Sequence, residues 1–325
     1  MKKRLLVLGC IAVVMLTGCG SSKETIKFGT AAIGGTYRMF GDTFTEMLTD
    51  KNENYDVEVK STAGSAANVR LLSKGYIQMA IAQTDIVNDA YHGTGIFEDG
   101  QKYQGYSAIG ALYSEACQIV VRADSDIESV DDLQGKKVSV GEEESGSEQS
   151  AEQILAAYGL SDKLVDEVNL DYTDAAKELQ NQKIDAFFCT AGTQTTVINE
   201  LSKQCDIRLL SIDENAAGKL KSAYKFYTDY TIPAGTYTGL TEPVDTLAVK
   251  AVLLASDKVS ADTVKNITEI LFQNKKELQL SLPADVILDE KTATEGVTIP
   301  FHKGAAEYYK SHGINVTIEK ESKGK

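Results

Sequence analysis

The sequence is poor in the residues and motifs that most often carry catalysis. It has only three histidines in 325 residues, and no two of them stand at a spacing that would bind a metal together: His92, His302 and His312. It contains no GxSxG, HExxH or CxxC motif. The acidic runs at 124–126 and 142–144 do not complete the spacing of a calcium loop. We therefore expect no enzymatic activity, no metal and no cofactor.

Positive charge is also scarce. The chain carries 33 Lys+Arg against 47 Asp+Glu, a formal net charge of −14. Affinity for nucleic acid comes mostly from Lys and Arg, so the acid excess argues against a nucleic-acid partner. Neither a Walker A loop nor a GxGxxG fingerprint is present, which argues against a nucleotide ligand. Three of the positive charges lie in residues 2–4, and a chain without them carries −17.

The sequence has no apolar run long enough to cross a membrane, which takes about 20 helical residues. Its longest run, at 5–16, follows Lys2, Lys3 and Arg4 and has the pattern of an export signal. It ends in Leu-Thr-Gly-Cys, the pattern of a bacterial lipobox, so we expect a lipoprotein signal peptide at 1–18 and lipidation of Cys19. Residues 19–24 would form the tether of an extracytoplasmic protein that meets the membrane through its lipid anchor only. An ordinary secretory signal with an incidental cysteine is the alternative.

Cysteine is too rare for a disulfide framework. With Cys10 removed and Cys19 lipidated, three remain: Cys117, Cys189 and Cys205. Cys117 and Cys189 lie in apolar runs, where a buried thiol acts as a small hydrophobic group. A bridge between Cys189 and Cys205 stays open at this point.

The pattern that is present is an α/β alternation. The length and an apolar fraction of 42% suit two domains of ordinary size. Short β-type runs alternate with helical patterns from residue 26 onward, which is typical of parallel sheets. Strands are expected at 26–30, 55–61, 77–82, 138–141, 167–172, 184–190, 207–210 and 246–254. Helices are expected at 36–49, 65–74, 145–159, 174–182, 261–277 and 304–310, with another opening at 83–85.

Four of the strand-to-helix turns combine glycine with a hydroxyl side chain. Glycine lets a ligand approach the backbone, and the N–H groups at a helix start favour an anion. Each turn taken singly is equally typical of an ordinary helix start. Four of them, split between two lobes, favour a cleft for a small carboxylate. The residues are Gly35, Thr36 and Tyr37, then Gly64 and Ser65, then Ser145, Gly146 and Ser147, and finally Gly192 and Thr193.

Other side chains near these turns have two interpretations each. Gln83 and Asp85 stand at the carboxyl end of a strand, where they would bind an amine or simply cap a helix. Arg38 follows the first turn, as a partner for a ligand carboxylate or as an exposed helical arginine. Tyr37 would contact a ligand or belong to the buried stripe that includes Phe40 and Phe44.

Taken together, these features resemble the TAXI group of solute receptors of tripartite ATP-independent periplasmic (TRAP) transporters. The matching segments occur in the family's order along the whole mature chain. They are GTAAIGGTY at 29–37, STAGSAANVRLL at 61–72, AQTD at 82–85, DLQGKKVSVG at 132–141, SGS at 145–147, IDAFF at 184–188, IPAGTY at 232–237 and IPFHKGAAEYY at 299–309. The last two segments together are the specific ones.

The resemblance implies a two-lobed, periplasmic-binding-protein-like (type II) α/β fold whose lobes close on a ligand in the cleft between them. Lobe I would comprise 24–114 plus 236–318 and lobe II 115–235, with a flexible tail at 319–325 and crossing segments near 117–121 and 230–236. It further implies a monomer that delivers glutamate or 2-oxoglutarate to TRAP permease subunits, with the turn residues, Gln83 and Asp85 in contact with the ligand.

Two positions depart from the family pattern. Arg38 replaces the usual aromatic residue after the tyrosine, and residues 193–195 are more polar than the usual segment, which favours a more polar solute. An importer driven by ATP uses receptors of the same design, so a substrate-binding lipoprotein of an ABC importer for a small organic anion is the alternative. An enzyme on this scaffold is a third reading, which the few titratable groups count against.

Overall fold

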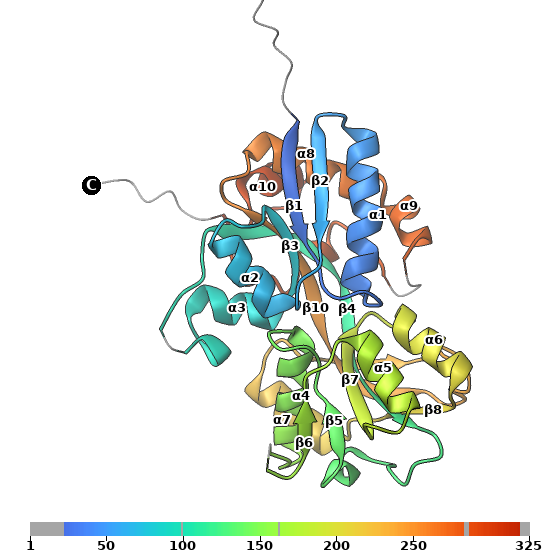
Figure 1. Cartoon of the computed structure of the whole chain (residues 1–325). Helices are drawn as coiled ribbons and strands as arrows, with labels where there is room; N and C mark the ends of the chain where they lie inside the picture. The colour runs from blue at the N-terminus through green and yellow to red at the C-terminus, as the bar shows by residue number, and fades with distance from the viewer. Residues whose placement is uncertain (1–22, 99, 162, 283–285, 319–325) are drawn as a thin grey trace, which may run out of the picture.

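The computed structural model describes residues 23–98, 100–161, 163–282 and 286–318. The expected signal peptide, Cys19, most of the tether and the tail at 319–325 lie outside this range. The chain forms two lobes stacked end to end, joined at a waist through which two long strands pass (Figure 1). One continuous mixed sheet runs through both lobes, in the order β2-β1-β3-β10-β4-β7-β5-β6.

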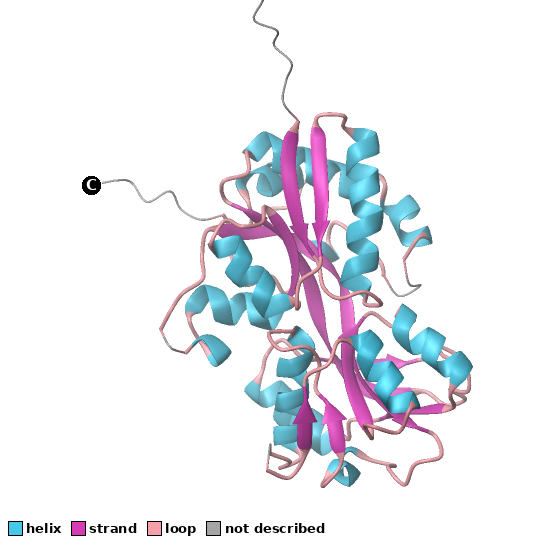
Figure 2. Ribbon diagram, in the orientation of Figure 1, coloured by secondary structure: helices cyan, strands magenta, loops and turns pink. Residues whose placement is uncertain are grey.

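The first lobe is built on three parallel strands, β1 (Glu24–Gly29), β2 (Tyr55–Lys60) and β3 (Met79–Gln83). A helix follows each strand: α1 (Thr36–Lys51), α2 (Ser65–Ser73) and α3 (Thr84–His92). The rest of this lobe consists of η1 (Gly95–Phe97), α8 (Ala261–Gln273), α9 (Lys275–Leu280), η3 (Thr292–Thr294) and α10 (Lys303–Ser311). The helices flank the strands in Figure 2.

The second lobe repeats the plan on a smaller scale. Its strands are β5 (Lys137–Ser139), β6 (Asp166–Val168), β7 (Ala186–Ala191), β8 (Ile207–Leu210) and β9 (Thr228–Ile232). Its helices are η2 (Val130–Leu133), α4 (Gly146–Ala157), α5 (Tyr172–Gln180), α6 (Thr196–Gln204) and α7 (Glu214–Ala223). Strands β5, β6 and β7 are parallel, as the α/β alternation predicts.

Two antiparallel strands cross the waist: β4 (Tyr106–Arg122) and β10 (Val244–Ser256). The two apolar runs within 105–122 thus form one strand of 17 residues. The second crossing lies inside β10 rather than at 230–236, because β9 pairs with residues 244–248 in the second lobe. Tyr237 and Val244 belong to the core of that lobe, whereas residues 251–255 belong to the core of the first. This packing moves the boundary expected at residue 236 to about Lys250.

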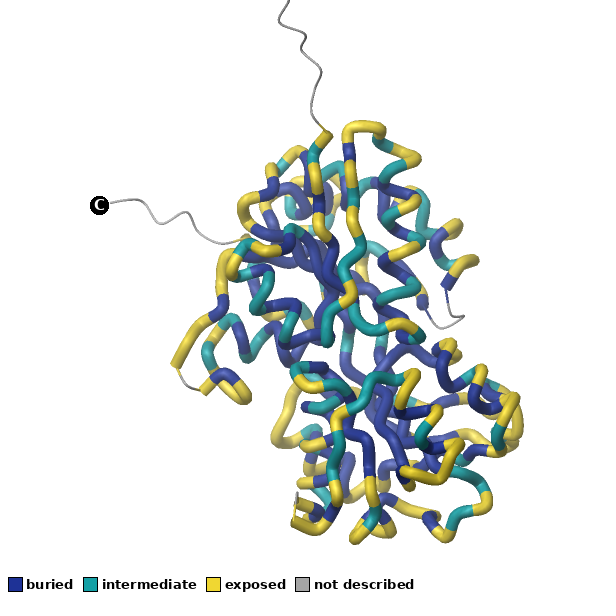
Figure 3. The backbone as a smooth tube through the Cα atoms, in the orientation of Figure 1, coloured by how far each residue is buried: buried dark blue, intermediate teal, exposed yellow. Residues whose placement is uncertain are grey.

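Each lobe has its own apolar interior, seen as dark blue tube in Figure 3. The stripe on α1 contributes Tyr37, Phe40 and Phe44, all buried. In the described part of the chain Cys117, Cys189 and Cys205 are free thiols, so the bridge between Cys189 and Cys205 is not formed. Cys117 and Cys189 are buried, as their apolar surroundings predict.

Two helix ends differ from the sequence prediction for local reasons. The helix expected at 261–277 breaks at Asn274, whose side-chain Nδ2 donates to the Ile270 carbonyl at 2.8 Å and ends α8. The strand expected at 167–172 ends at Val168, since the side chain of Asp171 caps α5 by accepting the N–H of Asp174 at 2.8 Å. Tyr172 therefore opens a helix instead of closing a strand.

Candidate functional site

The cavity between the lobes lies where the carboxyl ends of the parallel strands face each other. Its volume is about 40 Å³, several times the ~10–15 Å³ that one water needs. The turns after β1 and β2 and the last residue of β3 line one side, and the turns before α4 and α5 and the end of β7 line the other. Such edges are where α/β sheets bind ligands.

Nine residues predicted from the sequence come together around this one cavity. They are Gly35, Thr36, Tyr37, Gly64, Ser65, Gln83, Ser145, Gly146 and Ser147. Each is the N-cap of a helix, one of the first two residues of a helix, or the last residue of a strand. The turns that contain these residues therefore line one cavity, and their contact with a solute stays a prediction.

Ser65 and Ser147 occupy equivalent places in the two lobes. Ser65 Oγ accepts the N–H of Gln83, at the end of β3, at 3.0 Å. Ser147 Oγ accepts the N–H of Thr190, within β7, also at 3.0 Å. Each serine thus ties a helix start to a neighbouring strand, which holds the wall of the cavity in place.

A tyrosine stands beside each serine. The Tyr37 hydroxyl lies 3.5 Å from Ser65 Oγ and donates to Oε2 of Glu115 at 2.8 Å. The Tyr172 hydroxyl lies 2.5 Å from Ser147 Oγ and donates to the Thr190 carbonyl at 3.2 Å. Burial, with Glu115 nearby, raises the pKa of Tyr37 well above its usual value, so this phenol stays protonated and donates.

Three residues that line the cavity carry carboxylates: Glu115, Glu142 and Asp171. Glu115 is 1% exposed and sits in the middle of β4, near the waist. Burial raises the pKa of Glu142, and the nearby charge of Asp171 raises it further. Within the described part of the chain, no Lys, Arg or His lines the cavity. The lining is therefore acidic.

Several buried polar atoms of the lining have no hydrogen-bond partner among the described residues. They are Oγ1 of Thr36, Oε1 of Gln83 and Oγ1 of Thr190. All three residues are at most 3% exposed. An unsatisfied buried polar group costs about 1–3 kcal/mol, so these atoms are suited to receive a polar solute.

Helix starts supply donors to the same space. The first N–H groups of an α-helix have no partner within the helix. In α1 these include the N–H groups of Thr36 and Tyr37, and in α4 those of Gly146 and Ser147. Ser145 caps α4 by accepting the N–H of Glu148 at 3.0 Å, as the sequence spacing predicts. Two helix starts from opposite lobes therefore point partial positive charge at the cavity.

Four other predicted residues lie away from the lining. Arg38 is held by Asp42 at 2.8 Å and by Ser61 at 2.9 Å, outside the cavity wall. Asp85 is buried behind the wall in the first turn of α3. Gly192 and Thr193 follow β7, where Thr190 and Ala191 take the place expected for them.

Nine lining residues were not predicted from the sequence, and five of them are polar: Glu115, Glu142, Asp171, Tyr172 and Thr190. Glu115 had a signal, because β4 carries no other charged residue before its last one, Arg122. Tyr172 was hidden by the strand expected at 167–172. Thr190 is the last residue of the strand predicted at 184–190, whereas the predicted site residues begin two positions later, at Gly192.

Direct contacts hold the lobes together on both sides of the cavity. On one side the Glu144 carbonyl accepts the N–H groups of Ala66 and Ala67 at 3.1 and 3.3 Å, and the Glu144 side chain pairs with Arg70. On the other side the Gly34 carbonyl accepts the Thr195 hydroxyl at 2.9 Å. The structure is therefore a closed arrangement of the two lobes.

The described residues contain no group of three or more His, Cys, Asp or Glu arranged to hold a metal ion. In the same part of the chain no helix combines the length and apolarity that a membrane crossing requires.

The fold and the cavity define a class: the α/β, two-lobed, type II fold of periplasmic solute-binding proteins. A putative L-cystine ABC transporter protein from Listeria monocytogenes is 14% identical, with a TM-score of 0.52 over 82% of this chain and 98% of that chain. A protein of the glutathione import system of Streptococcus mutans is also 14% identical, with a TM-score of 0.52 over 83% and 99% of the two chains. At this identity the likeness concerns the fold alone.

Within this class, the chain belongs to the NMT1-like family. The model of that family matches residues 28–313, which include both lobes and every residue of the cavity wall.

Proposed function

We propose that this chain is the solute receptor of a membrane importer and that its lobes close around one small solute. The observation that carries the proposal is the cavity itself, which draws its wall from both lobes and holds buried polar atoms without partners. A solute that touches both lobes binds the closed form better than the open one, and this difference drives closure. Binding needs no covalent chemistry, so the receptor is not an enzyme.

The solute carries a carboxylate in this proposal. The starts of α1 and α4 present backbone N–H groups from opposite lobes, and Ser65 and Ser147 lie beside them. A carboxylate accepts several such hydrogen bonds at once. Glutamate and 2-oxoglutarate, the ligands implied by the TAXI resemblance, are the first probes.

The first candidate for the importer is an ABC transporter, which the comparisons favour. Two structural relatives with a TM-score above 0.5 are named as parts of a cystine ABC transporter and of glutathione import that uses a cystine ABC importer. A TRAP permease is the second candidate, which the motifs IPAGTY and IPFHKGAAEYY favour. The genes beside this one discriminate: an ATPase supports the first machine, and a large fused permease without an ATPase supports the second.

The receptor works outside the cell as a monomer held by lipidated Cys19. The lipobox at 16–19 is the basis for this location. In cells, Cys19→Ser is expected to move the protein from the membrane fraction to the soluble fraction. Size-exclusion chromatography of residues 23–325 checks the monomer.

Mass spectrometry of the solute that co-purifies with the protein tests the proposal most directly. A bound solute at 100 times its Kd stabilises the folded state by about 2.7 kcal/mol, which appears as a raised melting temperature. The solute should be recovered unchanged after incubation. A protein that responds to no amino acid or carboxylate, or that consumes its solute, contradicts the proposal.

A further inference from the structure

We infer that each lobe caps a helix of the other, so that the protein closes even when no solute is present. The inference goes beyond the proposed function, because it concerns what holds the lobes together and does not depend on which solute is bound. It is carried by two backbone carbonyls, those of Glu144 and Gly34, which lie on opposite sides of the cavity and reach across it.

Helix α2 of the first lobe has no side-chain cap among the described residues. Its N-cap is Gly64, and the first N–H groups of an α-helix have no partner within the helix. Glu144 of the second lobe supplies the missing acceptor, because its carbonyl accepts the N–H groups of Ala66 and Ala67 at 3.1 and 3.3 Å. The second lobe therefore caps a helix of the first.

Helix α6 shows the same arrangement with the lobes exchanged. Its N-cap, Thr195, makes no side-chain cap to α6 in the described part of the chain. Its start meets the first lobe instead. The Gly34 carbonyl accepts the N–H of Val197 at 3.4 Å and the hydroxyl of Thr195 at 2.9 Å. By contrast, the N-cap side chains of α4, α5, α7, α8 and α10 each accept an N–H of their own helix.

The Glu144 carbonyl is aimed by contacts within its own lobe. Glu144 has a left-handed backbone, with φ of 67°, which a glutamate rarely adopts. Its N–H donates to Oε2 of Glu148 at 2.8 Å, and Nδ2 of Asn169 donates to Oε1 of the same carboxylate at 2.7 Å. Gly34 has φ of 94°, which glycine adopts readily. Both acceptors are therefore in place before the lobes meet.

The side chain that meets Glu144 is also held in advance. Arg70 pairs with the Glu144 carboxylate across the cleft. Within the first lobe, its guanidinium carbon lies 4.9 Å from the centre of the Phe97 ring and 5.7 Å from that of Tyr103. Such rings attract a cation. Closure therefore orders few groups that were free before, so it costs little conformational entropy. A solute adds its contacts to lobes that already meet.

Amide hydrogen exchange of solute-free protein tests the inference. Wild-type protein is unfolded in guanidinium chloride and refolded to remove any co-purified solute. NMR then follows the N–H groups of Ala66, Ala67 and Val197, which face water when the lobes are apart. We expect all three to exchange at least about tenfold more slowly than in an unstructured peptide, and small-angle scattering to match the closed structure. Exchange at the peptide rate, or scattering from separated lobes, overturns the inference and leaves the receptor function intact.

Two substitutions of Glu144 separate its carbonyl from its carboxylate. Glu144→Gly removes the carboxylate but keeps the left-handed backbone that aims the carbonyl. Glu144→Val also removes the carboxylate and strongly disfavours that backbone, because valine is β-branched. We expect Ala66 and Ala67 to exchange at least about tenfold faster in Glu144→Val than in Glu144→Gly. Equal exchange in the two variants contradicts the role of the carbonyl.

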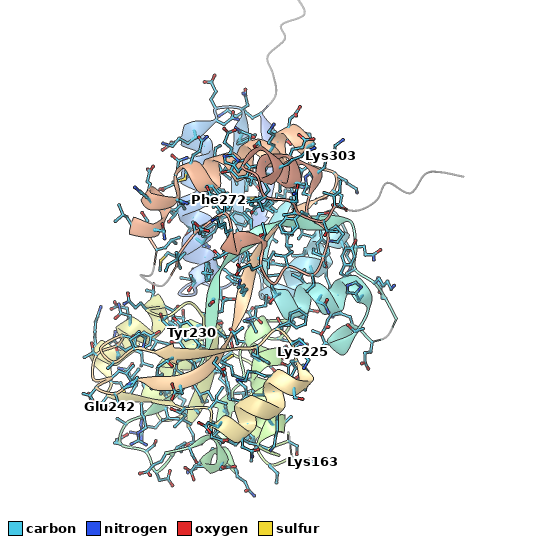
Figure 4. The ribbon with its side chains drawn as sticks, turned by 180° about the vertical axis from the view of Figure 1, so that it is seen from behind. Lys163, Lys225, Tyr230, Glu242, Phe272 and Lys303 are labelled. Atoms are coloured by element: carbon cyan, nitrogen blue, oxygen red, sulfur yellow. The ribbon has the colours of Figure 1, made fainter. Side chains whose placement is uncertain are left out.

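Two control pairs make the same changes elsewhere in the second lobe. Glu242 is exposed and lies away from the waist (Figure 4), so Glu242→Gly and Glu242→Val should not alter exchange at Ala66 or Ala67. Gln182 is exposed and has φ of 60°, so Gln182→Val introduces the same backbone strain without the contact, and Gln182→Gly relieves it. A control that opens the lobes as far as Glu144→Val does contradicts the role of Glu144.

The wild-type measurement stands as a test even where a variant does not fold. A protein that keeps these amides protected but binds no solute contradicts the receptor function and supports the cross-lobe caps.

Discussion

The side chain of Gln83 lies against the Cα of Gly146, so that these two residues bring the first and second lobes into contact at the cavity wall. A Cβ added at Gly146 would stand 2.2 Å from Oε1 of Gln83. Glycine at this position therefore permits the lobes to close, although the residue itself belongs to a helix.

Gly146→Ala should separate closure from folding. Alanine favours a helix over glycine by up to about 1 kcal/mol, so the second lobe should keep its stability. The new methyl group must displace the buried end of the Gln83 side chain, and overpacking of about 1–3 kcal/mol should hinder closure and weaken binding by about tenfold. Calorimetry and small-angle scattering measure affinity and opening. Gly218→Ala in α7, where nothing lies within 4 Å, is the control and should bind normally. Normal affinity in Gly146→Ala would show that the closed contact is not needed.

Glu144→Gln should shift the balance toward the open form by a small amount. The carboxylate pairs with Arg70 across the cleft, but both side chains are partly exposed, and such pairs contribute about 0–1 kcal/mol. We expect Kd to rise by up to about fivefold, with the difference shrinking in about 1 M salt. Exposed Glu143→Gln is the control. A difference that is independent of salt would rule out an electrostatic cause.

Tyr37→Phe should destabilise the protein and weaken binding together. The change removes the hydroxyl that donates to Glu115 at 2.8 Å inside the protein, a loss of about 1–3 kcal/mol. Chemical denaturation and calorimetry measure the two effects. Tyr76→Phe, at an exposed tyrosine, should change neither. Stability equal to wild type in Tyr37→Phe would mean that the hydrogen bond contributes nothing net.

Asp85→Asn should make stability less dependent on pH. Burial raises the pKa of Asp85 to about 7 from its usual 3.8, and nearby Asp89 adds to the effect. The folded state then binds the proton more tightly than the unfolded state, so stability falls as pH rises from about 4 to about 7 and is constant above. The variant should exceed wild type by a few kcal/mol at about pH 8 and match it near pH 4. Denaturation at a series of pH values checks this, with exposed Asp50→Asn as the control. A parallel pH profile in Asp85→Asn would exclude Asp85 as the source.

The convergence of the turns was predictable from the sequence, because parallel strands end at one edge and the residues after them must meet there. Positions near Ser65 and Ser147 follow from that rule alone. The exact first and last residues of the helices and strands could not be predicted in the same way. Asp171 begins α5 and Asn274 ends α8, each through a single side-chain hydrogen bond. Such bonds leave no periodic pattern in the sequence.

The charge of the residues that line the cavity was harder to predict than the position of the cavity. Arg38 lies next to a predicted turn, but its guanidinium forms an ion pair with Asp42, one helical turn later. Glu115 lies far from every turn in the chain and reaches the site because β4 crosses the waist. Proximity in the sequence thus suggested a basic residue, Arg38, in the cavity wall. The long-range pairing of strands instead places an acidic residue, Glu115, there.

The passage of β10 through the waist also sets the order in which the chain can fold. The first lobe draws its sheet from both ends of the sequence, since β3 pairs with residues 251–255. Most of the second lobe is one uninterrupted stretch between β4 and β10. In a chain that emerges with its N-terminus first, the edge of β3 therefore stays unpaired until residues 251–255 have emerged, when more than three quarters of the chain has been made. The second lobe completes its core earlier, so the nascent first lobe is the part exposed to aggregation.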